Sequence, residues 1–117
     1  MDDLLSGDAG ADQLSGSGGN DIIFFDGQDT VVDGGSGYDG AFYVGSGATN
    51  FDLKVNGFEY ASGGDGNDVF HAAYLGVSVG LSGGKGSDEL YAGDADDDLS
   101  GGEGADTIWG RAGDDYI

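Results

Sequence analysis

The chain has 117 residues with no cysteine and no proline, and its 23 acidic residues against three basic ones give a formal net charge of −20. This length suits one domain, and the lack of cysteine excludes a disulfide scaffold and a thiolate metal site. The negative charge argues against nucleic acid and anionic membranes as partners and favours cations. The longest apolar runs are too short to span a membrane, and no stretch has the layout of a signal peptide, so we expect a soluble chain with any export signal outside it.

Residues 1–42 carry a nine-residue repeat with Asp at the sixth place and an apolar residue at the eighth. Asp3 and Leu5 end a partial unit, and GDAGADQLS and GSGGNDIIF follow in the same register. The next unit, FDGQDTVV, has slipped by one residue, so that Asp29 or Thr30 takes the Asp place and Val31 or Val32 the apolar place. The unit GGSGYDGAF restores the register with Asp39. A fixed period of this kind indicates one small structural unit stacked on itself.

The middle of the chain is less regular. Residues 43–62 lose the repeat, and the alternating runs FDLKV and FEYA, separated by Asn56-Gly57, predict strands joined by ligand-poor turns. Residues 63–71, GGDGNDVFH, form one complete unit. Residues 72–82 are again irregular, with a predicted strand in VSVGL.

Residues 83–117 hold the best-kept repeats, GGKGSDELY, AGDADDDLS, GGEGADTIW and GRAGDDYI. An acidic, Gly-rich composition by itself is typical of disorder. The sustained register predicts instead an ordered stack, provided that something stabilises its turns.

The spacing predicts an all-β fold. Gly and Asp favour tight turns at places one to six, and places seven to nine form a short strand whose eighth residue points inward. Two units then make a coil of about 18 residues, and stacked coils form a parallel β-roll, a right-handed β-solenoid with two short-stranded parallel sheets, as one domain over residues 1–117. The predicted inward residues are Leu5, Leu14, Ile23, Phe70, Leu90, Leu99, Ile108 and Ile117. One apolar side chain per nine residues cannot offset the backbone entropy of folding, so the turns need another source of stability.

The same stacking places the sixth-place carboxylates in two columns, one along each edge of the roll. The first column holds Asp3, Asp21, Asp39, Asp97 and Asp115, and the second holds Asp12, Asp29, Asp68, Asp88 and Asp106. Stacked carboxylates repel one another, and calcium relieves this because it takes six to eight oxygen ligands from carboxylates and carbonyls. Six neighbouring pairs are candidate sites, namely 3 with 21, 21 with 39, 12 with 29, 68 with 88, 88 with 106 and 97 with 115. Zinc and softer metals lack their preferred Cys and His ligands.

The units GSGGNDIIF, GGDGNDVFH, GGKGSDELY and GGEGADTIW resemble the GGxGxDxUx nonapeptide of RTX (repeats-in-toxin) calcium-binding proteins, in which U is a large apolar residue. The resemblance implies a parallel β-roll with Ca²⁺ between adjacent turns, held by the ten Asp carboxylates named above and by Gly carbonyls. The implied carbonyl ligands are those of Gly16, Gly18, Gly34, Gly63, Gly83, Gly84, Gly101, Gly102 and Gly104. The slip at Asp29, the residues Ala92 and Ala95 in place of Gly, and the two irregular segments depart from the pattern, so sites there should be weaker or missing. Tight sites should cluster around Asp88, Asp97, Asp106 and Asp115 and around Asp3, Asp12 and Asp21.

The predicted function is a calcium-binding RTX module that folds on binding Ca²⁺ outside a bacterial cell and supports export and folding of a larger secreted protein. It is not itself an enzyme. Its expected partners are calcium ions and flanking domains, with end-to-end self-association at exposed sheet edges and no nucleic acid or membrane insertion. The alternative is an adhesin-type or carbohydrate-binding module, rigidified by calcium, that uses the outward aromatic residues Phe24, Phe42, Tyr91, Trp109 and Tyr116. A piece of an enzyme active site has only His71 and the irregular middle to support it.

Overall fold

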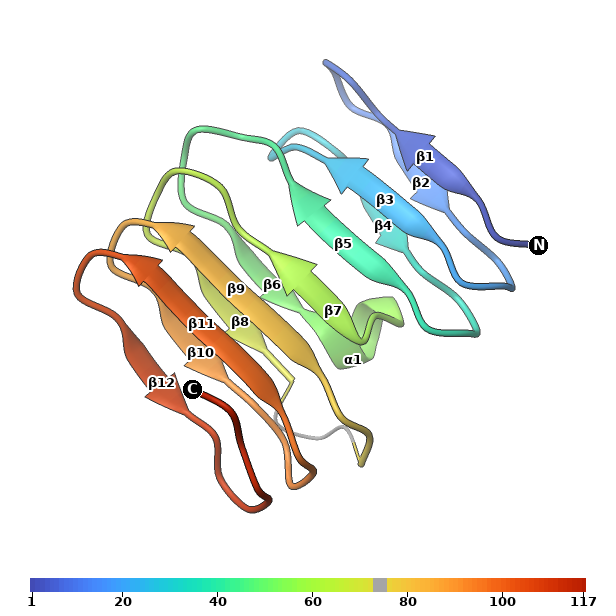
Figure 1. Ribbon diagram of the computed structural model, residues 1–117. Helices are drawn as coiled ribbons and strands as arrows, with labels where there is room; N and C mark the ends of the chain where they lie inside the picture. Colours follow the sequence, from blue (N-terminus) through green and yellow to red (C-terminus); the bar gives the residue numbers. More distant parts are fainter. Residues whose placement is uncertain (73–75) are drawn as a thin grey trace.

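The computed structural model describes residues 1–72 and 76–117, which form a flattened β-solenoid of about six coils (Figure 1). The first strand of each coil lies in a six-stranded sheet made of β1 (Leu4–Ser6), β3 (Ile22–Phe25), β5 (Gly40–Tyr43), β7 (Tyr60–Ser62), β9 (Gly80–Lys85) and β11 (Asp98–Glu103). The second strands lie behind it and are β2 (Gln13–Ser15), β4 (Val31–Asp33), β6 (Asn50–Asp52), β8 (Val69–His71), β10 (Glu89–Tyr91) and β12 (Thr107–Trp109). All pairings between these strands are parallel, so the predicted all-β roll is confirmed.

The rear layer differs from the single sheet that the repeat predicts. It consists of a two-stranded sheet, β2-β4, and a four-stranded sheet, β12-β10-β8-β6. The break between β4 and β6 coincides with the slipped unit before β4 and with a helical turn directly after β6. The slip leaves the coil length unchanged, since Leu14 pairs with Val32 and Ile23 with Ala41, each 18 residues apart. The coil that contains the helical turn is longer, since Ala41 pairs with Ala61, 20 residues further on.

The core is a thin double column of inward side chains between the layers. On the six-stranded sheet, Ile23, Ala41, Ala61, Leu81 and Leu99 follow one another in register and are buried. In the rear layer, buried Phe70 and Leu90 continue the column from Phe51, Leu14 is also buried, and Ile108 is partly buried. Leu5, on β1 of the six-stranded sheet, is partly buried as well. The expectation for Ile117 is wrong, because it lies beyond the final bridge from Tyr116 to Asp98 and is 70% exposed.

The irregular middle keeps the coil but inserts a helix. Helix α1 (Leu53–Asn56) begins after Asp52, whose side chain accepts a 3.1 Å hydrogen bond from the N–H of Val55. It ends at Gly57, which has the left-handed φ of 69° that favours glycine. The predicted strand FDLKV is therefore wrong after Asp52, because a side-chain cap and a C-terminal Gly favour helix there.

The other middle predictions have mixed outcomes. FEYA supplies strand β7, as expected, but β6 and β7 lie in opposite layers and do not form a hairpin. The strand predicted in VSVGL starts only at Gly80 and continues to Lys85, and the earlier part of segment 72–82 includes residues 73–75, which lie outside the described part of the chain. Among residues 1–72 and 76–117, no helix has the length and apolarity needed to cross a membrane.

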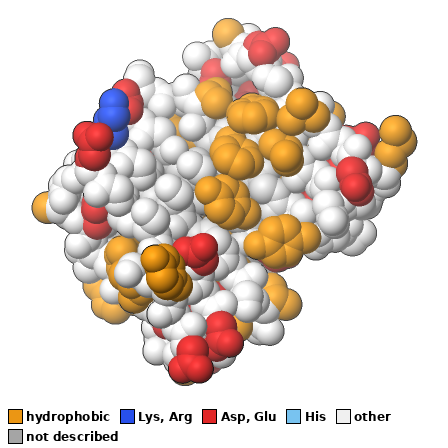
Figure 2. All heavy atoms as spheres, viewed as in Figure 1, with side chains coloured by type: hydrophobic (Ala, Val, Ile, Leu, Met, Phe, Trp, Pro, Cys, Tyr) orange, Lys and Arg blue, Asp and Glu red, His pale blue; other side chains and the backbone are white. Residues whose placement is uncertain are grey.

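Apolar side chains also gather on the outer face of the six-stranded sheet, over its N-terminal strands (Figure 2). Phe24, Phe42 and Tyr60 project outward from β3, β5 and β7, with ring centroids 5.3 and 5.4 Å apart. The places in register with Phe24 and Phe42 hold serine on the later strands, so the outer face is apolar at one end and more polar at the other. These residues are Ser62 on β7, Ser82 on β9 and Ser100 on β11.

Candidate metal centre

The turns stack on one another along both edges of the roll. The N–H of Gly66 donates to the carbonyl of Lys85 at 2.9 Å, and the N–H of Gly86 donates to the carbonyl of Glu103 at 2.8 Å. A side chain at Gly104, with φ of 134°, would lie under 3.0 Å from the carbonyl oxygen of Gly86. Gly at the fourth place of the repeat is therefore required by close approach between turns as well as by backbone conformation.

The carboxylates at the sixth place form a hydrogen-bonded ladder along each edge. In all six pairs expected from the sequence, the backbone N–H of the first Asp donates to Oδ1 of the second, at 2.7 to 3.1 Å: Asp3 to Asp21, Asp21 to Asp39, Asp12 to Asp29, Asp68 to Asp88, Asp88 to Asp106, and Asp97 to Asp115. The structure thus brings together the members of every pair. One oxygen of the second carboxylate in each pair is used by the backbone of the neighbouring coil.

The other carboxylate oxygen, Oδ2, has no hydrogen-bond partner in four of these Asp residues. Oδ2 of Asp21, Asp39, Asp68 and Asp88 is buried and has no hydrogen-bond partner. A buried carboxylate oxygen without a donor or a cation is strongly unfavourable, because the charge has lost its water. These four oxygens are therefore candidate positions for a bound cation.

Each unpartnered oxygen lies beside the first Gly of its own turn and a carbonyl of the next coil. A Cβ added at Gly83 would lie under 3.0 Å from Oδ2 of Asp88 and from the carbonyl oxygen of Gly101. The same relation holds at Gly63, with Asp68 and the carbonyl of Gly83. It also holds at Gly16, with Asp21 and the carbonyl of Gly34. The missing side chain at the first place leaves a small space lined by carboxylate and carbonyl oxygens, which we call a cradle.

This donor set fits calcium. Among the described residues, no three His, Cys, Asp or Glu side chains converge as a metal-binding group. Each cradle instead mixes one carboxylate with main-chain carbonyls, and such neutral and charged oxygens are the ligands of hard cations. When bound, the ion would neutralise the carboxylate and occupy the lone pairs of the carbonyls.

Of the nine glycines expected to supply carbonyl ligands, some lie at the cradles and others only stack one turn on the next. Gly34, Gly83 and Gly101 present their carbonyl oxygens to a cradle, and Gly16 and Gly63 lie at the first place of a cradle. Gly18 bridges to Ser36, Gly84 pairs with Gly102 where β9 meets β11, and Gly104 stacks on Gly86. These last four glycines build the stacked turns.

Two of the ten Asp residues have both oxygens hydrogen-bonded. Oδ1 and Oδ2 of Asp97 accept from the N–H groups of Val79 and Gly93, at 2.9 and 3.2 Å. Those of Asp29 accept from Asp12 and Asp26, at 3.1 and 2.8 Å. The first place of the Asp97 turn is Ala92, whose methyl group is buried where the other turns leave a cradle. Both carboxylates belong to units that depart from the repeat pattern.

The other carboxylates complete the two columns. Oδ2 of Asp106 lies beside Gly101, and Oδ2 of Asp115 lies beside Gly110, in each case under 3.0 Å from where a Cβ would be. Asp12 faces Asp29 across Gly7, and Asp3 contributes its N–H to Asp21 at the first coil.

Burial changes the acidity of three carboxyl groups. Desolvation raises the pKa of Asp39, Asp88 and Asp97 above the usual value, and neighbouring carboxylates add to the rise. Backbone N–H donors, such as that of Asp68 to Asp88, lower the pKa and offset part of this effect. Without a cation these groups are therefore poor places for negative charge.

The sequence interpretation missed two members of the columns. Glu59 takes the Asp place after Asp39, whose N–H donates to Oε2 of Glu59 at 2.9 Å. Thr49 precedes Asp68 in the other column and donates its N–H to Oδ1 of Asp68 at 2.8 Å. The signal for Glu59 is an acid two residues before the inward Ala61, the same offset as Asp21 to Ile23.

A second ladder runs beside the first, from side chains at the fifth place. Asn20 donates its N–H to Asp2 and accepts, through Oδ1, from the N–H of Tyr38, at 2.9 and 3.0 Å. Asn67 accepts from Ser87 in the same way. These exposed side chains satisfy the backbone of the neighbouring turn, so they stabilise stacking and do not enter a cradle.

The rear outer face carries a stack of three rings. The ring of Tyr91 lies 4.8 Å from that of His71 and 4.3 Å from that of Trp109, with interplanar angles of 12° and 6°. Stacking between strands uses most of the ring faces. His71 therefore packs against Tyr91 in this stack.

Comparison with known proteins gives four matches to the family model of the RTX calcium-binding nonapeptide repeat, over residues 1–32, 55–73, 81–108 and 91–117. No curated protein and no solved structure matches the chain significantly. The family matches cover well over half of the sequence and include the turns of Asp21, Asp68 and Asp88, whereas Gly34 and Asp39 lie outside them. The chain belongs to the RTX calcium-binding repeat family.

Proposed function

We propose that this module folds when calcium fills the cradles along its two edges. The observation that carries the proposal is the set of four buried, unpartnered Oδ2 atoms. Without cations, the folded chain must bury these charges and stack further carboxylates in columns, within a formal charge of −20. The thin core does not offset these costs, so the metal-free chain remains largely unfolded.

The proposal extends to where the module works. Extracellular calcium modules typically have Kd values of about 10⁻⁴ to 10⁻³ M, so such a module stays unfolded inside a cell and folds after export. We infer that the chain supports export and folding of a larger secreted bacterial protein as its non-catalytic part. Its partners are then the flanking domains, together with a second copy that pairs end to end at edge strands such as β12.

Counting bound ions tests the calcium proposal. Native mass spectrometry and isothermal titration calorimetry with calcium chloride should show at least four ions per chain, one for each buried, unpartnered Oδ2 atom. Magnesium chloride at the same concentration is the matched control and should give little binding, because magnesium requires a stricter octahedron. Absence of calcium binding at 10 mM would contradict the proposal.

A second candidate function, recognition of a neutral glycan, is favoured by one hollow on the outer face of the six-stranded sheet. It has a volume of about 390 Å³, and its lining includes Asn20, Ile22, Tyr38, Phe42 and Tyr60. Aromatic walls with a few polar groups suit a sugar ring, and the negative charge disfavours acidic sugars. Glycan binding by the calcium-loaded wild type that is lost in Phe42→Ser and kept in Trp109→Ala would support this function. No binding to a neutral glycan array would exclude it.

A further inference from the structure

Only one of the two oxygens of the Asp39 carboxylate is hydrogen-bonded, as in the regular turns. It is fully buried, its Oδ1 accepts a 2.7 Å hydrogen bond from the N–H of Asp21, and its Oδ2 has no partner. The turn that faces it from the next coil contains no GGxGxD sequence. That turn is helix α1, followed by Gly57, Phe58 and Glu59.

Helix α1 presents a carbonyl oxygen where a regular turn would present one. The left-handed Gly57 donates its N–H to the carbonyl of Leu53, which ends the helix. A Cβ added at Gly34 would lie under 3.0 Å from the carbonyl oxygen of Gly57 and 3.0 Å from Oδ2 of Asp39. The two oxygens therefore line one space beside Gly34, as the carbonyl of Gly34 and Oδ2 of Asp21 do beside Gly16.

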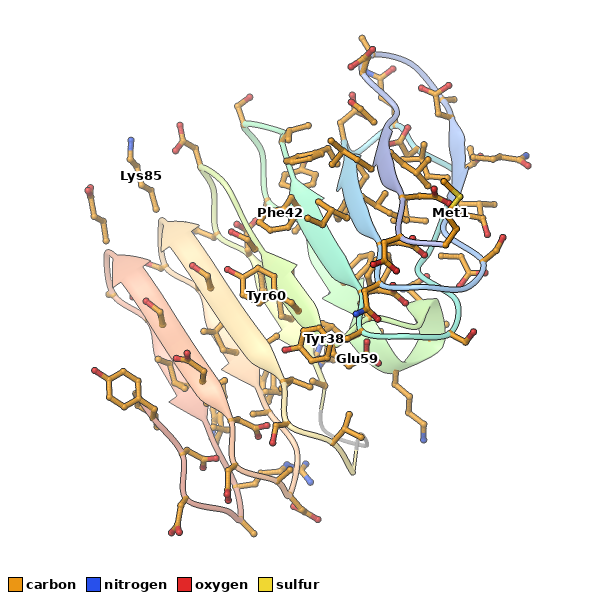
Figure 3. All side chains as sticks on the ribbon, turned by 45° about the vertical axis from the view of Figure 1, so that its right-hand side comes forward. Met1, Tyr38, Phe42, Glu59, Tyr60 and Lys85 are labelled. Atoms are coloured by element: carbon orange, nitrogen blue, oxygen red, sulfur yellow. The ribbon has the colours of Figure 1, made fainter. Side chains whose placement is uncertain are left out.

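Glu59 supplies the second carboxylate. Its Oε2 accepts the N–H of Asp39 at 2.9 Å, as Oδ1 of Asp39 accepts the N–H of Asp21. The backbone N–H of Glu59 also donates to the carbonyl of Asp39, at 3.1 Å, so the two residues are held together from both sides. Figure 3 shows Glu59 beside Tyr38, at the turn edge that carries α1.

We propose a further calcium site formed by Asp39 Oδ2, the carbonyl oxygen of Gly57 and the carboxylate of Glu59, in which a capped helical turn replaces the missing repeat. Oδ2 of Asp39 is fully buried without a partner and lies beside Gly34, so this acidic pair holds a charge that needs a cation. The inference rests on the proposed function, that cradles of this roll bind calcium. It changes the role of the middle of the chain from a ligand-poor spacer to a segment that continues one calcium column.

Ion counting on the full chain with calcium chloride tests the site. Native mass spectrometry of Glu59→Gln should show one ion fewer than the wild type, or one site weakened at least tenfold by calorimetry. Glu103→Gln, which removes an exposed turn carboxylate, is the matched control and should bind as the wild type does. An unchanged ion number and affinity in Glu59→Gln would overturn the site while leaving the other cradles in place. A wild type that binds no calcium would overturn the proposed function itself.

Nuclear magnetic resonance of the wild type tests the same site and does not require Glu59→Gln to fold. The side-chain carboxyl ¹³C resonance of Glu59, followed at the last stage of a calcium titration, should shift together with that of Asp39. The resonance of Glu103 should not shift at that stage. A Glu59 resonance that, like that of Glu103, does not shift at this stage would contradict the site.

Discussion

The backbone N–H of Asp68 donates a 2.7 Å hydrogen bond to Oδ1 of Asp88, while Oδ2 of Asp88 is buried without a partner. Oδ1 of this carboxylate therefore joins neighbouring coils through a backbone hydrogen bond, and Oδ2 lines a cradle. The negative charge of the carboxylate is left for calcium to neutralise.

Asp88→Asn should weaken the calcium-loaded roll by removing that charge. Loss of one site costs about 2.7 kcal/mol of unfolding free energy when free calcium is about 100 times the Kd. Chemical denaturation at saturating calcium measures this, with Asp94→Asn in an exposed part of a turn as the control. Equal stability of the two variants would show that the Asp88 cradle holds no ion.

Gly83→Ala should abolish the same cradle without removing a carboxylate. The new methyl group would lie under 3.0 Å from Oδ2 of Asp88 and from the carbonyl of Gly101. Gly47→Ala is the matched control, since a Cβ there meets no atom within 4 Å. We expect fewer bound ions and a lower melting temperature for Gly83→Ala alone. Similar ion counts for both variants would argue against the cradle.

Ala92→Gly should create a binding site. Both oxygens of Asp97 accept backbone N–H groups, and the Ala92 methyl lies at the first place, where other turns have Gly. Removing the methyl opens a cradle and frees Asp97 to turn toward it. Calorimetry should detect one added or strengthened calcium site relative to the wild type. A weaker total affinity would indicate that Ala92 contributes only packing.

The repeat predicted the roll and the neighbours within each Asp column, because both depend on a fixed period of nine. It did not predict α1, since the capping side chain of Asp52 and the left-handed Gly57 act locally and override the strand pattern of FDLKV. It also missed Glu59, which occupies the Asp place after a coil that is 20 residues long, as the pairing of Ala41 with Ala61 shows.

The differences among the Asp residues are likewise not visible in the motif. Asp88 and Asp97 hold the same place in consecutive units, yet only Asp88 keeps an unpartnered oxygen. The distinction lies in the N–H of Gly93, which donates to Oδ2 of Asp97 in a turn whose first place is Ala92. A sequence pattern records such substitutions as departures but does not show how the carboxylate responds to them.

Phe51→Ala should destabilise the middle of the roll through packing. Phe51 is buried on β6, and its ring centroid lies 5.0 Å from that of Phe25 and 5.5 Å from that of Phe58. Loss of a core Phe costs about 3 to 5 kcal/mol. Denaturation at saturating calcium should show this loss, whereas Val55→Ala, at an exposed helix position, should have little effect. A negligible loss in Phe51→Ala would show that calcium alone holds the middle coils.

Acid should stabilise the metal-free roll. The pKa values of Asp39, Asp88 and Asp97 are raised by burial, so the folded chain binds more protons than the unfolded chain as pH falls. This contribution is fully present below the unfolded pKa, about 4, and is lost as pH rises through the raised folded values. Circular dichroism in a chelator should therefore show more β structure near pH 4 than at pH 7. Less β structure at pH 4 would contradict the role of these carboxyl groups.

Far-ultraviolet circular dichroism of the wild-type chain during a calcium titration at pH 7 tests the central claim most directly. We predict a disordered spectrum in chelator that converts cooperatively to a β-sheet spectrum as calcium is added, with no such change on adding magnesium. A chelated chain that already has the full β-sheet spectrum, unchanged by calcium, would contradict the claim that cations in the turn cradles fold this module.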